Sequence, residues 1–390
     1  MSANGVARAA LAAGLAVQAV FATVALARSA EPADDFDRYY EIATDPGRPY
    51  IDYQVEHPIG TWLIFKSFTA IPGGRASFGR SVVLANAAAD AAIVGALLWT
   101  WGVPAAAYYV LVASPIAGLL FNRIDFWSLA AGTLAVAAWW HRRVRSALIA
   151  LAAGVLLKIW PLVFAAAFVS DRRLNARAIV RAVGIAVVAA AAILLVADAR
   201  AIVDVITFRH ARGWQIESIV GSLVHAVGRE PPRMESGSWR VGSMSELTAV
   251  ALFAIAAPVS LWCSWRGFRR RLIGTGWLAS MSWLLALSAL FSAQYIAWLI
   301  PGGAIAWTEG NRRSASLAAC CVVLTQMFWS YYEQVVGGVT FAMLLVIVRN
   351  AMVLALAIDA TAALAAGSRL QANLQPQLTA EGVVERAEQW

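Results

Sequence analysis

The chain has 390 residues, of which 60% are hydrophobic, and its formal net charge is +8. A mean hydropathy of +0.65 is more than a soluble domain of this size needs, and several apolar runs approach the ~20 residues that cross a bilayer. We therefore predict an all-α polytopic membrane protein; a β-barrel would show alternating segments of about 10 residues instead. The basic residues are nearly all Arg and cluster in short loops, which indicates membrane orientation and no nucleic-acid binding.

The first predicted helix covers residues 6–27. Its apolar stretch is longer than the ~7–15 residues of a signal-peptide core, and the following Asp-Asp-Phe-Asp stretch, residues 34–37, is a poor cleavage context. We expect this helix to be retained as a membrane span.

Further spans are predicted from apolar runs along the chain. They lie near residues 80–100, 103–121, 125–140, 176–197, 247–265, 271–291, 293–308, 315–332 and 338–365. The apolar stretch 146–170 is interrupted at Lys158-Ile-Trp-Pro161, where proline favours a break in a helix. We predict two half-helices that meet there; the alternative is one crossing, with the topology reversed downstream.

Positive charge predicts the orientation in the membrane. Basic clusters at residues 141–145, 171–177, 265–271 and 311–313 are expected to be cytoplasmic. The loops 29–79 and 198–246 then face the other side, and both termini are cytoplasmic. We expect a single domain, residues 1–366, with 10–12 membrane segments in the plasma (inner) membrane, followed by a polar, disordered cytoplasmic tail, residues 367–390.

An acidic stretch follows the first helix. Residues 29–57 hold eight of the 23 acidic side chains, although the surrounding sequence is apolar. A membrane protein that places carboxylates at the end of a span often uses some of them for chemistry or ion handling.

Four polar segments are predicted to converge on this outer face. Carboxylates can take protons from hydroxyl groups, cationic side chains can hold a phosphate, and aromatic rings can stack on sugars. Together these properties suit glycosyl transfer from a lipid phosphate to a hydroxyl. The four segments are residues 34–58, residues 122–125, residues 209–218 and residues 291–298.

Each element also has an ordinary structural explanation. An Asp beyond a span is usually a solvated loop residue, and Lys158 could extend to the interface with its amine in water. Arg123 and Asp125 could form a local ion pair, and Tyr295 could belong to an interfacial aromatic belt. Cys263, Cys320 and Cys321 show no metal spacing and are expected to be small apolar side chains without disulfides.

The ordered set of motifs resembles a known family, the polyprenol-phosphate-mannose-dependent α-mannosyltransferases of glycosyltransferase family 87, which have the GT-C fold. A more distant resemblance is to the GPI mannosyltransferases of the endoplasmic reticulum. The matching features are Asp35 with Tyr39, the Pro49–Pro58 stretch, Asn122-Arg-x-Asp125, Lys158-x-x-Pro161, Gly213-x-Gln-Ile-Glu-Ser218 and Ser292-x-Gln-Tyr-x-x-Trp-Leu-x-Pro301. The chain departs from the family at His57-Pro58-Ile59, where relatives often have Tyr-Pro-Pro, and at Ala293, where they often have Pro.

The resemblance implies an inverting transferase that moves a sugar, mannose above all, from a polyprenyl-phosphate donor to a hydroxyl of a lipid or glycan acceptor. Asp35 would be the general base, although the neighbouring Asp34 and Asp37 leave this assignment open. The implied donor-phosphate residues are Arg123, Lys158, His210 and Arg212. The implied sugar or acceptor pocket is Asp34, Tyr39, Asp52, Glu56, His57, Asn122, Asp125, Gln215, Glu217, Gln294 and Tyr295.

No cofactor is expected, because phosphate is a good leaving group and the lipid donor is itself a substrate. The sequence has no P-loop and no Gly-x-Gly-x-x-Gly after a strand. It shows no clear metal cluster, although several carboxylates could bind a divalent cation loosely. Two alternatives remain at this stage: a transporter or flippase of lipid-linked sugars, and an enzyme that uses polyprenyl-phosphate arabinose or glucose. The sequence predicts neither the acceptor nor the oligomeric state.

Overall fold

The computed structural model describes residues 3–31, 34–169, 211–228 and 230–366. The predicted span 176–197, the predicted phosphate ligand His210 and the predicted tail 367–390 lie outside the described residues.

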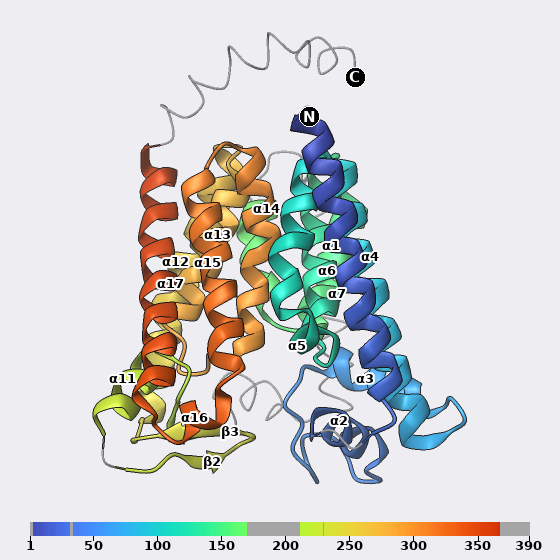
Figure 1. Ribbon diagram of the computed structural model, residues 1–390, viewed down its shortest axis with the longest axis vertical. Coiled ribbons are helices and arrows are strands. Elements are labelled where there is room, and N and C mark those ends of the chain that lie inside the picture. Colours follow the sequence, from blue (N-terminus) through green and yellow to red (C-terminus); the bar gives the residue numbers. More distant parts are fainter. Residues whose placement is uncertain (1–2, 32–33, 170–210, 229, 367–390) are drawn as a thin grey trace.

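The described chain forms an upright bundle of helices (Figure 1). Its long elements are α1 (Ala3–Arg28), α4 (Gly74–Ala113), α6 (Asp125–Trp140), α7 (Val144–Leu157), α12 (Glu246–Arg269), α13 (Ile273–Ala286), α14 (Ile300–Thr308), α15 (Arg312–Trp329) and α17 (Thr340–Ala366). Short elements gather at one end of the bundle, which we call the loop end; they are α2 (Asp34–Thr44), α3 (Ile59–Thr69), α11 (Ile219–Val227), α16 (Tyr332–Val336) and three strands. Ala3 and Ala366 lie at the opposite end.

Composition and exposure identify the bundle as a membrane protein. Four described stretches are long and apolar enough to span a bilayer: Asn4–Arg28, Gly74–Phe121, Leu247–Arg269 and Thr340–Ala366. Large apolar side chains on their outer faces are exposed, including Val20, Phe253 and Ile358. Exposed apolar side chains along whole helices are unusual in soluble proteins, and lipid is the solvent that suits them.

The stretch Gly74–Phe121 reverses direction at Gly102. This glycine has φ 78° and ψ −173°, a backbone conformation that a side chain would strain. The two arms then run antiparallel: Asn86 Nδ2 donates a hydrogen bond of 2.8 Å to the carbonyl of Phe121, and Tyr109 Oη donates one of 2.6 Å to Asp90 Oδ1. The arms correspond to the spans predicted at 80–100 and 103–121.

The predicted break in 146–170 is confirmed. Helix α7 ends at Leu157, and Lys158 has an extended backbone with φ −160° and ψ 138°. The chain continues as the 3₁₀ helix η2 (Trp160–Phe164) and the short α8 (Ala165–Val169). Phe168 stacks on Trp139 near the far end of α6, with ring centroids 4.3 Å apart, so this segment turns back along the bundle.

The predicted loop 198–246 contains a small sheet that the all-α prediction did not include. Strands β1 (Trp214–Gln215), β3 (Ser238–Val241) and β2 (Arg233–Glu235) pair antiparallel in the order β1-β3-β2. Ser236 and Gly237, both with positive φ, form the two-residue turn of the β2–β3 hairpin. The buried Arg240 donates hydrogen bonds to the carbonyls of Gly213 and Glu235, which ties β1 to the hairpin.

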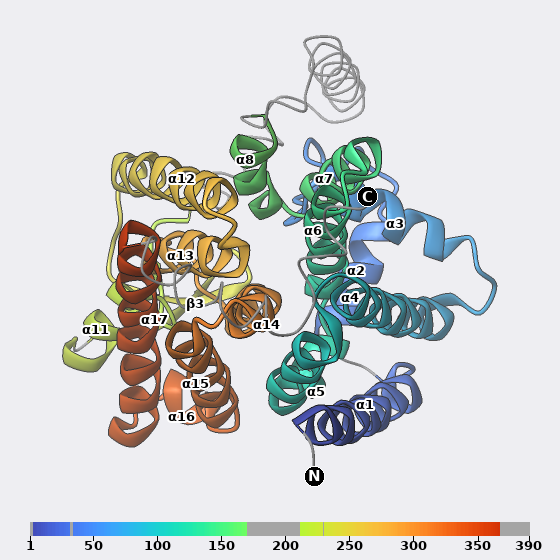
Figure 2. The same cartoon turned by 90° about the horizontal axis from the view of Figure 1, so that it is seen from above.

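The helices form two groups in the view from above (Figure 2). One group contains α1 and α4–α7, with α5 at Ala117–Phe121, and the other contains α12–α15 and α17. Tyr108 connects them: its hydroxyl donates a hydrogen bond of 2.6 Å to the carbonyl of Ala315. The loop end spans both groups, so side chains from each can meet there.

Gly274 marks a close approach of helices α13 and α14. A Cβ atom there would lie 2.6 Å from the carbonyl carbon of Ile305 and 2.7 Å from the oxygen of Gly302. Because these are backbone atoms, the helices would have to separate. We expect Gly274→Ala to destabilise the protein by about 1–3 kcal/mol, seen as a lower Tm in detergent. Gly95→Ala is the control, since nothing lies within 4 Å of its added Cβ; equal Tm values for the two variants would contradict this packing.

The arrangement also predicts opposite accessibility of the two ends. Single cysteines at the exposed Arg145 and Arg313 should react with an impermeant thiol reagent from one side of a sealed vesicle, and a cysteine at Arg48 only from the other. The parent should carry Cys320→Ala, because Cys320 is the exposed native thiol. Labelling of Arg48→Cys and Arg145→Cys from the same side would contradict the orientation.

Candidate active site

The site is centred on Arg123, in the short link between α5 and α6. Its Nη1 atom lies 2.5 Å from Oδ1 of Asp35, which stands in the first turn of α2. The helix N-terminus itself favours a carboxylate at this position. Both side chains stay partly accessible, with exposed fractions of 24% and 28%, so the pair lies at the boundary between protein and solvent.

Helix α2 is held in this position from several directions. Its buried face packs Phe36, Tyr39 and Ile42 into the core. Asp37 pairs with Arg75 Nε of α4 at 2.5 Å, and Arg38 pairs with Glu56 at 2.9 Å. These contacts fix the direction in which Asp35 projects.

Lys158 and Asp125 form a second ion pair. Lys158 Nζ lies 2.5 Å from Asp125 Oδ1, and the indole N–H of Trp298 donates a hydrogen bond of 3.0 Å to the same oxygen. Asp125 begins α6 and is 1% exposed. The break after Leu157 leaves the lysine amine at the end of α7, where it can reach this carboxylate.

An aromatic wall borders Lys158. Its amine lies 4.5 Å from the ring centroid of Tyr295 and 5.2 Å from that of Trp298, within the range of cation–π contact. Tyr295 stacks on Trp298 at 4.4 Å, and Trp298 stacks on Trp160 at 5.5 Å. These rings come from η3 (Ala293–Leu299) and η2, so the wall joins the two groups of helices.

Glu217 approaches Arg123 from the turn between β1 and α11. It is 2% exposed, and burial raises the pKa of its carboxyl to about 7, against the opposing effects of Arg349 and Arg123. Burial also lowers the pKa of Arg123, but Asp35, Tyr39, Asp125 and Glu217 outweigh this and raise it overall. Arg123 is therefore the cation on which three carboxyl groups, those of Asp35, Asp125 and Glu217, converge.

Tyr39 lies under the Asp35–Arg123 pair. Its ring stacks on Phe65 at 4.8 Å and meets His57 edge-on at 5.6 Å. Burial, followed by the charge of Asp35, raises the pKa of the Tyr39 hydroxyl, so this group stays protonated at physiological pH. Tyr39 thus contributes a buried, protonated hydroxyl near the Asp35–Arg123 pair, and its ring packs against His57 and Phe65.

Several predicted site residues have other contacts. Asp52 is exposed and pairs with Arg48 of its own turn, and Glu56 pairs with Arg38. Asn122 donates to the carbonyl of Gly118, one turn earlier in α5. Arg212 is exposed, and its backbone N–H donates a hydrogen bond to Glu235. Gln215 donates to Ser292 Oγ at 2.8 Å, and Gln294 is partly buried beside Tyr295. The side chain of Asp34 lies outside the described residues.

The structure also adds residues that the sequence reasoning missed. Trp160 joins the aromatic wall beside Trp298, which lies in the predicted segment 291–298, and Tyr332 lies beside Glu217. Arg349 and Asn350 of α17 bind the carbonyl of Glu217 at 2.9 and 3.2 Å. The signal for these two was present, because an Arg-Asn pair within the apolar run 338–365 is costly in a membrane unless it has a task.

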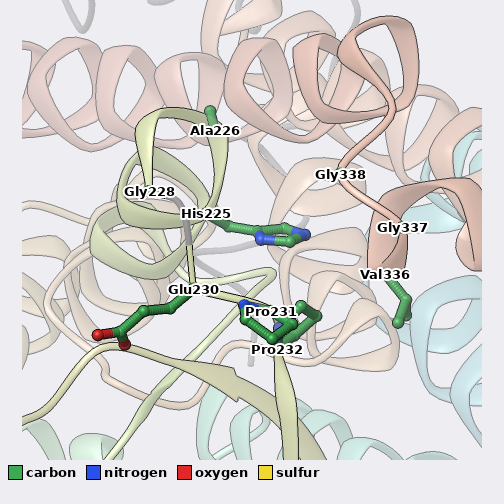
Figure 3. Close-up of a pocket in the computed structure, with 9 residues that line it drawn as sticks. All are labelled: His225, Ala226, Gly228, Glu230, Pro231, Pro232, Val336, Gly337 and Gly338. Carbon is green, nitrogen blue, oxygen red and sulfur yellow. The ribbon is translucent and has the colours of Figure 1, made fainter.

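Two further observations concern ligands. Within the described ranges, no group of three or more His, Cys, Asp or Glu side chains could hold a metal ion. A surface depression of about 370 Å³ lies between α11 and the turn from α16 to α17, and the imidazole of His225 points into it (Figure 3). The carboxylate of Glu230 points away from it. His225 is occupied by a 2.8 Å contact with the carbonyl of Val335.

Comparisons with known proteins were made at the level of sequence and of structure. No protein-family model and no curated protein matches the chain. Among solved structures it is similar to the crystal structure of ArnT from Cupriavidus metallidurans in the apo state, with 15% identity and a TM-score of 0.43, over 97% of this chain and 80% of that chain. A likeness at this level assigns neither a fold family nor an activity.

The Lys158–Asp125 pair should be strongly coupled. Removing either charge leaves the other side chain of the pair buried without this counter-charge. Asp125→Asn and Lys158→Met should therefore each lower the free energy of unfolding by about 3–5 kcal/mol. The double variant should lose less stability than the two single variants added together, as measured by unfolding in detergent. The exposed Arg48–Asp52 pair is the matched control and should show no coupling. Additive losses at Asp125 and Lys158 would show that the two side chains do not interact.

Proposed function

We propose that the chain is an integral membrane glycosyltransferase of GT-C architecture that takes its sugar from a polyprenyl-phosphate donor. The observation that carries this proposal is the pairing of Asp35 with Arg123 beside the Lys158–Asp125 pair and its aromatic wall. Two cations, a partly exposed carboxylate and stacked rings thus meet where the long apolar helices end. Few reactions other than transfer from a lipid phosphate need all of these groups at a membrane boundary.

The two cations suit a phosphodiester. Arg can bind two phosphate oxygens at once, and Lys adds a compact charge. In the structure Arg123 pairs with Asp35, and a donor phosphate would replace that carboxylate. The polyprenyl chain would remain among the apolar outer faces of the helices, which explains why such an enzyme is membrane-embedded.

The proposed reaction inverts the anomeric carbon. The acceptor hydroxyl forms a bond to that carbon, its proton passes to Asp35, and the bond to the phosphate oxygen breaks. The leaving polyprenyl phosphate keeps the electron pair, and Arg123 and Lys158 stabilise its charge. Tyr295 and Trp298 would stack on the sugar, and Glu217 would accept a hydrogen bond from one of its hydroxyls.

Mannose is the proposed sugar, and the acceptor is a lipid or glycan hydroxyl. The proposal for mannose rests on the motif resemblance, because pentose and hexose pockets differ by a single hydroxymethyl group. Neither a cofactor nor a metal takes part in the proposed steps.

The proposed orientation places the site outside the cytoplasm. Exposed arginines gather at the end of the bundle opposite the loop end, including Arg145, Arg271 and Arg313. Positive charge favours the cytoplasmic side, so the loop end would face outward from a plasma (inner) membrane, with both termini inside.

Reconstitution tests the activity directly. Purified protein in liposomes with radiolabelled polyprenyl-phosphate mannose and a lipid extract should transfer label to a new lipid or glycan. Asp35→Asn should reduce transfer by at least ~10²-fold, the usual contribution of a general base, while donor binding is no weaker than in the parent, because the phosphate no longer has to displace a carboxylate from Arg123. Glu41→Gln, an exposed carboxylate on the same helix, should transfer normally.

Other outcomes have defined meanings. Near-normal transfer by Asp35→Asn would remove Asp35 from the base role. Transfer from an arabinose or glucose donor, but not from mannose, would change the sugar. Movement of the intact donor across the bilayer without any transfer would instead establish a flippase.

A further inference from the structure

Arg349 and Asn350 place a fully polar pair inside the apolar helix α17. Their side chains are 0% and 3% exposed. Asn350 Nδ2 donates to the carbonyls of Glu217 and Ser218 and to Ser222 Oγ, at 3.2, 3.1 and 2.9 Å. Arg349 Nη2 adds a hydrogen bond of 2.9 Å to the Glu217 carbonyl. The pair therefore fixes the turn from which Glu217 projects.

The guanidinium does more than bind a carbonyl. It lies 3.8 Å from the ring centroid of Phe291 and 5.0 Å from that of Phe328, and its Nε and Nη1 atoms have no hydrogen-bond partner among the described residues. A buried cation with idle donors is costly. An Asn or Gln could bind the same carbonyl at lower cost, so the positive charge itself needs an explanation.

Glu217 supplies that explanation. The charges of Arg349 on α17 and of Arg123 on the α5–α6 link both lower the pKa of the Glu217 carboxyl, against the larger effect of its burial. The charge of Arg349 helps to keep this buried carboxylate ionised, and an ionised Glu217 is, with Asp35, a counter-charge to Arg123. The chain of interactions runs from Arg349 through Glu217 to Arg123 and Asp35, and it crosses between the two groups of helices.

We propose that Arg349 is a positioning residue for the active site, which holds Glu217 toward Arg123 and thereby keeps Arg123 oriented when the donor phosphate displaces Asp35. This inference rests on the proposed function and deepens it. Arg349 does not touch the donor or the acceptor in this arrangement, and its effect passes through Glu217.

The inference predicts a specific pH dependence. The groups that face Glu217 are Arg349 on α17, Arg123 on the α5–α6 link and Tyr332 on α16. With a Glu217 pKa of about 7, the ionised fraction rises as pH rises through that value. Removing the positive charge of Arg349 raises this pKa further, so transfer that depends on ionised Glu217 moves to higher pH.

The experiment compares Arg349→Gln, Arg349→Lys and Glu217→Gln in the reconstituted transfer assay. Arg349→Gln should shift the rising limb of the pH–rate profile upward by at least about one unit. Arg349→Lys keeps the positive charge but loses the planar guanidinium. The rising limb of its pH–rate profile should therefore stay near that of the parent, while kcat falls. Glu217→Gln should lack the limb. A uniform loss of activity in Arg349→Gln, with the limb unmoved, would reduce Arg349 to a structural role.

A second readout separates this inference from the proposed function. Infrared pH titration of the parent, with Glu217→Gln as the difference reference, reports the protonated carboxyl of Glu217 without turnover. Its midpoint should rise in Arg349→Gln and stay in Arg349→Lys. If no sugar donor supports transfer by the parent, the proposed function fails, and this midpoint still decides whether Arg349 controls Glu217. Equal midpoints in all Arg349 variants would overturn the inference.

Discussion

The positive charge of Arg123 is the constraint on which the loop end depends. A cation at the end of a helix pair, partly removed from water, is unfavourable unless counter-charges surround it. Asp35 reaches it from α2, and Glu217 reaches it from the turn after β1. These carboxylates belong to segments far apart in the chain, one on each group of helices. Satisfying a single guanidinium therefore brings the first loop and the small sheet to one place.

Lys158 follows the same logic within the apolar bundle. A continuous helix through 146–170 would carry the lysine past the boundary without a partner, whereas the break at Lys158 leaves its amine against Asp125. Trp298 completes the arrangement, because its indole N–H binds the same carboxylate oxygen while its ring lies beside the amine. The helix break and the ion pair are thus one structural solution. It requires Pro161 to stop the helix and Asp125 to begin the next one.

The sequence predicted the parts that depend on local composition. Apolar runs located the helices, and Lys158 with Pro161 located the break, because chain direction and helix termination are local properties. The predicted boundary between 80–100 and 103–121 corresponds to the reversal at Gly102. The sheet was missed, since its strands of two to four residues carry no periodic signal. The partners of Glu56 and Arg349 were also out of reach, because those pairings depend on how distant segments pack.

The Asp35–Arg123 pair gives the proposed mechanism a built-in order of events. A carboxylate held 2.5 Å from a guanidinium is a weak base, because the cation stabilises its ionised form. A phosphodiester that takes over Arg123 would release Asp35 from this stabilisation and make it a stronger base. Asp35 would then become a stronger base only when the donor is bound. Before that, an acceptor or water molecule would meet Asp35 still paired with Arg123. Glu217 suits this exchange, since its charge would still favour Arg123 in place after the donor phosphate has displaced Asp35.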